Sequence, residues 1–282
     1  MSDLPARPDR SERQRRRRSR RRRRGERGPR RGVYLLPQLF TTANLFFGFF
    51  TIVQAEAGNF DRAALGIVLA GICDGLDGRV ARLAKATSRF GVEYDSLADA
   101  VSFGLAPALL AFHAGHLQDF RRTGFAVAFL YVACAALRLA RFNVQPSRYP
   151  GRFEGLPSPA AAGMVASTQW FVSFLREQTI HVEVPEALVA AGVASLGLLM
   201  VSAIPYRSFK ELDIRHGYRG IVLMVIALVV IIQEPSVALF AIGAFYVASG
   251  PVEWIWRSVS GRRLERTPPP DAAPIPAEET PA

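Results

Sequence analysis

Long apolar runs without charge dominate this chain and restrict what it can fold into. Seven charge-free runs alternate with short polar segments, at residues 35–55, 100–118, 123–137, 155–175, 187–206, 220–233 and 235–252. A helix that spans a bilayer needs roughly 20 mostly apolar residues, and most of these runs reach that length with a few flanking residues. A soluble protein could not cover so many wholly apolar helices with so few polar faces. The sequence therefore predicts an all-α, polytopic membrane helix bundle.

We predict about eight transmembrane helices, at residues 34–55, 63–84, 93–114, 123–142, 157–175, 186–205, 219–233 and 235–256. Loop charges indicate their orientation, because cytoplasmic loops carry an excess of Lys and Arg. With the N-terminus in the cytoplasm, the predicted cytoplasmic loops hold twelve basic residues and the opposite loops hold four. Both termini are therefore expected on the cytoplasmic side of the cell (inner) membrane.

The net charge of +11 lies entirely in the N-terminal tail. Residues 1–31 contain fifteen arginines and four acidic residues, and the rest of the chain has no net charge. A tail of this composition cannot bury enough apolar surface to fold. It is expected to help fix topology or to meet anionic headgroups, and no specific nucleic acid is expected, because no aromatic residue interleaves the arginines to stack bases.

The chain therefore divides into three predicted parts. Residues 1–33 form a disordered, Arg-rich cytoplasmic tail, residues 34–257 form the membrane domain, and residues 258–282 form a disordered tail rich in Pro, Ala and Glu.

Four aspartates stand in two pairs around one predicted turn. Asp74 and Asp77 are three residues apart, and Asp95 and Asp99 are four apart, so each pair shares one face of its helix. Residues 83–91 form a short connection, which makes the two helices antiparallel neighbours. The four carboxylates are therefore expected to converge at the cytoplasmic end of this hairpin.

Such a cluster needs positive charge, because four anions near hydrocarbon repel one another and are costly to desolvate. Carboxylate oxygens with no nearby His or Cys suit hard ions such as Mg²⁺ or Mn²⁺. A pair of these ions, roughly 3.5–4 Å apart, is a known clamp for phosphoryl chemistry. Gly78 would let a phosphate approach the backbone closely, and Arg82 could neutralise a diphosphate with paired donors. The segment is therefore interpreted as a binding site for a metal-bound diphosphate.

The two pairs belong to one longer pattern, Asp74-x-x-Asp77-Gly78-x-x-Ala81-Arg82, eight residues, then Gly91-x-x-x-Asp95-x-x-x-Asp99. This pattern resembles the full signature of the CDP-alcohol phosphatidyltransferase family. The resemblance implies that the four aspartates hold two divalent ions and that Asp99 also acts as the general base. It further implies contacts to the CDP-lipid from Thr41, Asn44, Gly78, Arg82 and Ser88.

Later segments resemble the branch of this family that makes phosphatidylserine. They cover residues 45–49, 95–107, 136–143, 153–159, 204–210 and 246–251. This resemblance implies transfer of the phosphatidyl group from CDP-diacylglycerol to L-serine, with release of CMP, by a homodimer in the bilayer. Arg138, Arg141 and Asn143 are candidates for binding the acceptor, although the two arginines would equally satisfy the positive-inside rule.

Two alternatives remain open from the sequence. The first is the same chemistry on glycerol 3-phosphate or inositol phosphate, because those family members share the aspartate signature. The second is an ion or solute transporter, because carboxylates within a membrane often mark ion paths. A transport site would normally lie near the midplane of the bilayer, whereas these aspartates cluster near one face.

Overall fold

The computed structural model describes residues 35–84, 88–144, 152–179, 184–207 and 233–261 of the chain, and these residues are mostly helical. The helices are α2 (Leu35–Glu56), α3 (Phe60–Ala84), α4 (Arg89–Asp99), the π-helix η2 (Ala100–Leu105), α5 (Ala106–Ala114), α6 (Arg121–Val144), α7 (Ser158–Glu177), α8 (Glu186–Val201) and α10 (Pro235–Val259). The predicted span at 219–233 and the two predicted tails lie outside or almost wholly outside the described residues.

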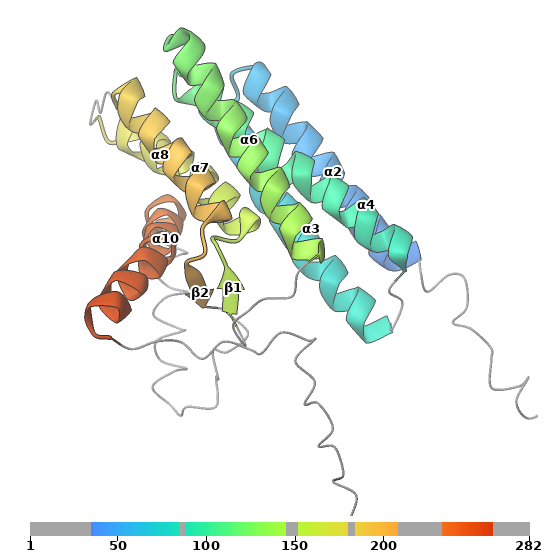
Figure 1. Ribbon diagram of the computed structural model, residues 1–282. Helices are drawn as coiled ribbons and strands as arrows, with labels where there is room; N and C mark the ends of the chain where they lie inside the picture. The colour runs from blue at the N-terminus through green and yellow to red at the C-terminus, as the bar shows by residue number, and fades with distance from the viewer. Residues whose placement is uncertain (1–34, 85–87, 145–151, 180–183, 208–232, 262–282) are drawn as a thin grey trace, which may run out of the picture.

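The helices form two neighbouring groups (Figure 1). In the first, α2 packs along α3 and also contacts α4, η2 and α5. Helix α6 belongs to this group, because it packs against η2 and α5. In the second, α7 packs against α10 and contacts α8. The two groups meet where α7 contacts α3 and where α8 packs against α6. This arrangement confirms the predicted helical bundle.

Small residues allow α2 and α3 to approach closely, as is common where helices pack in membranes. Ala63, Ala64 and Ala70 of α3 are fully buried. A Cβ on Gly66 would lie 2.3 Å from the Oγ1 atom of Thr51, and that hydroxyl donates a hydrogen bond to the Ala63 carbonyl oxygen at 3.0 Å. The two helices therefore form one tight hairpin.

The next helical segment, Arg89–Ala114, is continuous but changes its winding at η2. Single π-turns of this kind are rare and often occur at functional sites. Here the Ser102 hydroxyl donates a hydrogen bond to the Asn44 carbonyl oxygen of α2 at 2.9 Å. Gly48 makes this contact possible, since a Cβ there would lie 2.3 Å from the Ser102 Oγ atom. The π-turn is thus locked against α2.

Two short strands, β1 (Arg152–Glu154) and β2 (Pro205–Arg207), are the part of the fold that the all-α prediction missed. They pair antiparallel, with Phe153 opposite Tyr206. After β1 the chain turns at Gly155, which has a φ of 76° and donates its N–H to the Ile204 carbonyl oxygen. Three-residue strands leave too little alternation in a sequence to be recognised.

Tyr206 connects this hairpin to the last helix. Its hydroxyl donates a hydrogen bond to the Val247 carbonyl oxygen of α10 at 3.0 Å. Burial, together with the neighbouring Tyr246, raises the pKa of Tyr206 to about 12, so the hydroxyl keeps its proton and remains a donor at neutral pH.

Three of the described helical segments are long and apolar enough to cross a membrane: Arg89–Ala114, Arg121–Val144 and Pro235–Val259. Large apolar side chains are also exposed along the bundle, which suits contact with lipid rather than water; among them are Phe46, Phe49, Phe125, Phe129, Phe245 and Trp256. The structure therefore supports a membrane protein.

The predicted number of about eight spans is not established by these helices. α8 ends at Val201 after 16 residues, because the chain enters β2 where the prediction continued the helix to residue 205. α3 carries acidic and basic residues at both ends, which shortens its apolar part.

Replacing Gly48 with alanine is expected to lower the thermal midpoint of the protein in detergent. The added methyl group would overlap Ser102, and overpacking of this kind costs about 1–3 kcal/mol. Gly163→Ala is the matched control, since a Cβ at Gly163 meets no atom within 4 Å and alanine is the better helix former. Equal midpoints for the two variants would contradict the tight contact between α2 and η2.

Candidate active site

Four carboxylates meet between α3 and α4, as the spacing predicts. Oxygen atoms of Asp74, Asp95 and Asp99 lie within 4.8 Å of one another. Asp77 is buried, with 5 % of its surface exposed, and its carboxyl group contacts that of Asp95. Residues from two helices, separated by a connection in the sequence, therefore form a single acidic site.

The start of α4 fixes the direction in which its aspartates project. Ser88 is the N-cap residue, with extended backbone angles, and its Oγ atom accepts a hydrogen bond from the Gly91 N–H at 3.0 Å. Such a cap satisfies an amide at the helix N-terminus that has no partner within the helix. The contact between Ser88 and the CDP-lipid stays a prediction.

Helix α2 supplies a hydrogen-bond donor to each side of the cluster. The Thr41 hydroxyl lies 3.1 Å from Asp77 Oδ2, and 3.2 Å from the Pro37 carbonyl oxygen of its own helix. The Asn44 Nδ2 atom donates to Asp99 Oδ1 at 2.9 Å. Thr41 and Asn44 are both buried. They therefore hold one aspartate on α3 and one on α4.

The family resemblance implies CDP-lipid contacts for Thr41 and Asn44, so these bonds to the aspartates were not predicted. A signal for them does exist in the sequence. Thr41 and Asn44 are three residues apart on an otherwise apolar helix, so they share a face, and polar side chains in such helices usually hydrogen-bond to a neighbouring helix.

The donor atoms of the cluster fit a hard divalent cation. All are carboxylate oxygens, which Mg²⁺ and Mn²⁺ prefer as ligands. In addition, the buried Oδ1 atom of Asp95 has no hydrogen-bond partner, and a buried polar atom of this kind normally has one. Asp74, Asp95 and Asp99 could together hold a metal ion, with Asp77 beside them.

One side of α3 at the site is open. A Cβ added at Gly75 or Gly78 would meet no atom within 4 Å. Gly78 and Arg82 are exposed on the last turns of the helix. This surface leaves the backbone approachable by a ligand as large as a diphosphate.

Arg138 reaches the same site from α6. Its Nη1 atom donates a hydrogen bond to the Ser158 hydroxyl at 2.8 Å, and Ser158 is fully buried at the start of α7. The Nε atom of Arg138 is buried and has no hydrogen-bond partner. Helix α6 packs against η2, which begins directly after Asp99, and the carboxylate of Asp99 attracts the guanidinium of Arg138. A cationic donor therefore lies close to the carboxylate cluster.

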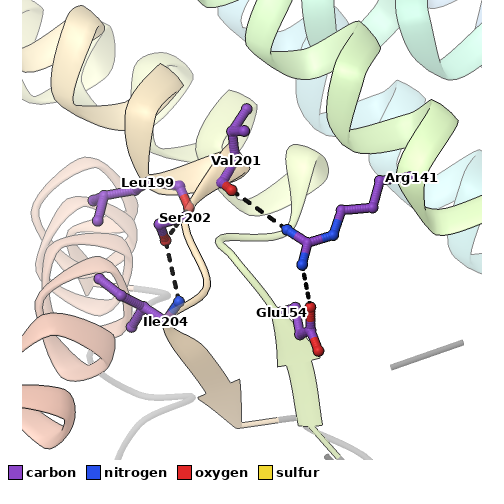
Figure 2. Close-up of polar contacts among 6 residues, drawn as sticks. All are labelled: Arg141, Glu154, Leu199, Val201, Ser202 and Ile204. Atoms are coloured by element: carbon purple, nitrogen blue, oxygen red, sulfur yellow. Dashed lines mark hydrogen bonds and ion pairs between the residues drawn. The ribbon is translucent and has the colours of Figure 1, made fainter. Parts of the chain in front are cut away.

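Arg141, one turn further along α6, has different partners (Figure 2). It forms an ion pair with Glu154 of β1, and its Nη1 atom lies 3.5 Å from the Val201 carbonyl oxygen at the end of α8. Asn143 donates a hydrogen bond to the Ser96 hydroxyl of α4 at 2.8 Å. These two residues tie the end of α6 to its neighbours, and their predicted role in acceptor binding stays a prediction.

Fold and site together define a class of protein: a helical membrane protein whose clustered carboxylates suit divalent cations and phosphate chemistry. The family model described as CDP-alcohol phosphatidyltransferase matches residues 34–232. The chain belongs to the CDP-alcohol phosphatidyltransferase family.

Curated relatives are similar over most of the chain. A CDP-diacylglycerol–serine O-phosphatidyltransferase of Helicobacter pylori (strain ATCC 700392 / 26695) is 39% identical over 82% of this chain and 95% of the relative. A protein of the same name from Mycobacterium tuberculosis (strain ATCC 25618 / H37Rv) is 34% identical over 71% of each chain. The archaetidylserine synthase of Methanothermobacter thermautotrophicus is 36% identical over 61% of this chain and 69% of its own.

Asp95→Asn is expected to weaken Mn²⁺ binding by roughly 10-fold or more, because the site loses one negative ligand. The free Mn²⁺ signal in electron paramagnetic resonance measures this binding directly. Glu93→Gln is the matched control, since it removes an exposed carboxylate from the same helix outside the cluster. An equal loss of binding in both variants would show a general effect of surface charge instead of a site.

Proposed function

We propose that this chain transfers the phosphatidyl group of CDP-diacylglycerol to the hydroxyl group of L-serine, giving phosphatidylserine and CMP. The observation that carries the proposal is the convergence of four aspartates from α3 and α4 in a member of this family. The names of relatives that align with most of the chain support serine as the acceptor. The archaeal relative is named an archaetidylserine synthase, which also refers to serine.

Asp74, Asp77, Asp95 and Asp99 are proposed to hold two divalent ions, Mg²⁺ or Mn²⁺. When bound, such ions neutralise the diphosphate and stabilise the charge that develops on the leaving phosphate. The absence of His or Cys from the donor set supports hard ions.

Asp99 is proposed to act as the general base. It accepts the proton of the serine hydroxyl, and the serine oxygen forms a bond to the phosphorus that carries diacylglycerol. The bond from this phosphorus to the oxygen it shares with CMP breaks, and CMP leaves with that oxygen. The hydrogen bond from Asn44 supports this role, because it fixes the direction of the carboxylate. A positioned base typically contributes ~10²–10⁴ in rate.

The CDP end of the lipid is proposed to lie along the open surface of α3. Gly78 allows close approach to the backbone, and Arg82 can pair with the diphosphate; both are exposed at the end of that helix. Ser88 and Thr41 are the remaining candidates for contacting the nucleotide, whereas the side chain of Asn44 is already bonded to Asp99.

The acceptor is proposed to lie on the opposite side of Asp99, against α6. Serine carries a carboxylate that needs a cation, and Arg138 offers a buried Nε–H without a partner near the base. Arg141 and Asn143 are further candidates for contacting the acceptor, although both already bond to protein groups. Arg138 is therefore the stronger candidate for binding the carboxylate.

The chain is proposed to span the cell (inner) membrane about eight times, with the site and both termini in the cytoplasm, and to act as a homodimer. Loop charge supports the orientation. The exposed apolar side chains of the described helices support insertion in a bilayer.

CMP release from radiolabelled CDP-diacylglycerol tests the function. The purified protein is expected to release CMP with L-serine, and only when Mg²⁺ or Mn²⁺ is present. Glycerol 3-phosphate and inositol phosphate serve as competing acceptors, and a preference for either would replace serine.

Asp99→Asn should lose roughly 100-fold or more in turnover while it still binds the CDP-lipid. Asp119→Asn, which changes an exposed loop carboxylate, should retain activity.

Arg138→Ala is expected to raise the KM for L-serine by roughly 10-fold or more, since a hydrogen bond to a charged group contributes about 1.5–3 kcal/mol. The KM for the CDP-lipid should change little. Arg141→Ala should raise the serine KM less and lower the thermal midpoint more, because it breaks the ion pair with Glu154. If both variants affect serine and CDP-lipid equally, Arg138 has a structural role instead.

A further inference from the structure

Among the described residues, three buried side-chain atoms lack a hydrogen-bond partner, and all three belong to the surroundings of Asp99. They are Asn44 Oδ1, Asp95 Oδ1 and Arg138 Nε. Asn44 bonds to Asp99 directly, Asp95 shares its carboxylate cluster, and Arg138 lies on α6, which packs against η2 directly after Asp99. Leaving a buried polar group unpaired costs about 1–3 kcal/mol, so the concentration of three at one place indicates ligand groups that complete them.

The orientation of the Asn44 amide follows from its partner. A carboxylate oxygen only accepts hydrogen bonds, so the group that faces Asp99 at 2.9 Å is the Nδ2 amide NH₂ group. The Oδ1 atom belongs to the same planar amide and is therefore held beside the carboxylate of the base. It is an acceptor without a donor.

Asn44 cannot turn away to satisfy this oxygen elsewhere. The residue is fully buried. Its backbone is fixed by the hydrogen bond from Ser102, and Gly48, one turn further along α2, packs against the same serine. Asn44 is thus fixed at its backbone by Ser102 and at its side chain by Asp99.

We propose that Asn44 Oδ1 accepts a hydrogen bond from the ammonium group of the acceptor, while Nδ2 holds Asp99. This inference rests on the proposed function, because it takes an α-amino acid with a hydroxyl group as the acceptor. Serine carries three polar groups on adjacent carbons. Asp99 of α4 takes the hydroxyl proton, Arg138 of α6 pairs with the carboxylate, and Asn44 of α2 pairs with the ammonium. Asn44 is then a specificity-determining residue on the acceptor side of the site.

Asp95 Oδ1 is the less suitable partner for the ammonium. It belongs to the carboxylates whose oxygens lie within 4.8 Å of one another, and an anionic oxygen in such a cluster suits a metal ion better. The neutral carbonyl of Asn44 can accept from an ammonium without adding charge to the site.

The test uses two fragments of serine, each supplied to the full-length protein as an acceptor or as an inhibitor of serine-dependent CMP release. Ethanolamine keeps the ammonium and the hydroxyl, and 3-hydroxypropionate keeps the carboxylate and the hydroxyl. Asn44→Ala is expected to raise the half-maximal concentration of ethanolamine by roughly 10-fold or more and to leave that of 3-hydroxypropionate within about 3-fold. Arg138→Ala should give the reverse pattern. Gln54→Ala removes an amide from the same helix outside the site and should change neither.

Asn44→Leu keeps nearly the shape of asparagine but lacks both the acceptor and the donor. It should therefore lose the response to ethanolamine as Asn44→Ala does while its kcat falls, and this variant carries the test if Asn44→Ala does not fold. An equal change for both fragments, or a change confined to the KM of CDP-diacylglycerol, would overturn the proposal in favour of a structural or nucleotide role. Failure of the parent protein to release CMP with serine would instead overturn the proposed function itself.

Discussion

The organisation of this bundle depends on keeping several carboxylates together beside apolar helices. Four acidic side chains at one point repel each other and lose hydration, so they persist only where donors and cations offset the cost. Helix α2 provides the donors that the structure describes, through Thr41 and Asn44. For these short side chains to reach the cluster, α2 must lie very close to α3 and η2. The small residues at those contacts, such as Gly66 and Gly48, follow from this requirement.

The same requirement explains why the segment after the cluster is not a regular α-helix. The π-turn η2 begins directly after Asp99 and brings Ser102 onto the α2 backbone. Asp99 is thereby fixed on one side by the Asn44 side chain and on the other by a segment bonded to the Asn44 backbone. A carboxylate held in this way, here the proposed base, loses little freedom when substrate binds, which is how preorganised sites lower the cost of reaching the transition state.

The two arginines of α6 show that neighbouring, chemically identical residues can have different partners. Spacing alone makes Arg138 and Arg141 equivalent candidates for an anionic acceptor. In the folded chain, Arg141 is neutralised by Glu154 and bridges toward the end of α8 (Figure 2), whereas Arg138 is directed to Ser158 and keeps one buried donor unpaired near Asp99. The strand β1 that supplies Glu154 is too short to be recognised from the sequence, so the difference between the arginines could not be foreseen.

The sequence by itself determined the helical membrane class, most helix boundaries to within a few residues, and the convergence of the four aspartates. These features depend on long charge-free apolar runs and on side-chain spacing within one hairpin, and the order of residues gives both directly. The tertiary structure decided the partners of the aspartates, the π-turn, the β1–β2 pair and the early end of α8. Each of these depends on contacts between segments far apart in the chain, such as the 55 positions that separate Asn44 from Asp99, and a local pattern can mark a polar residue without saying which distant residue it meets.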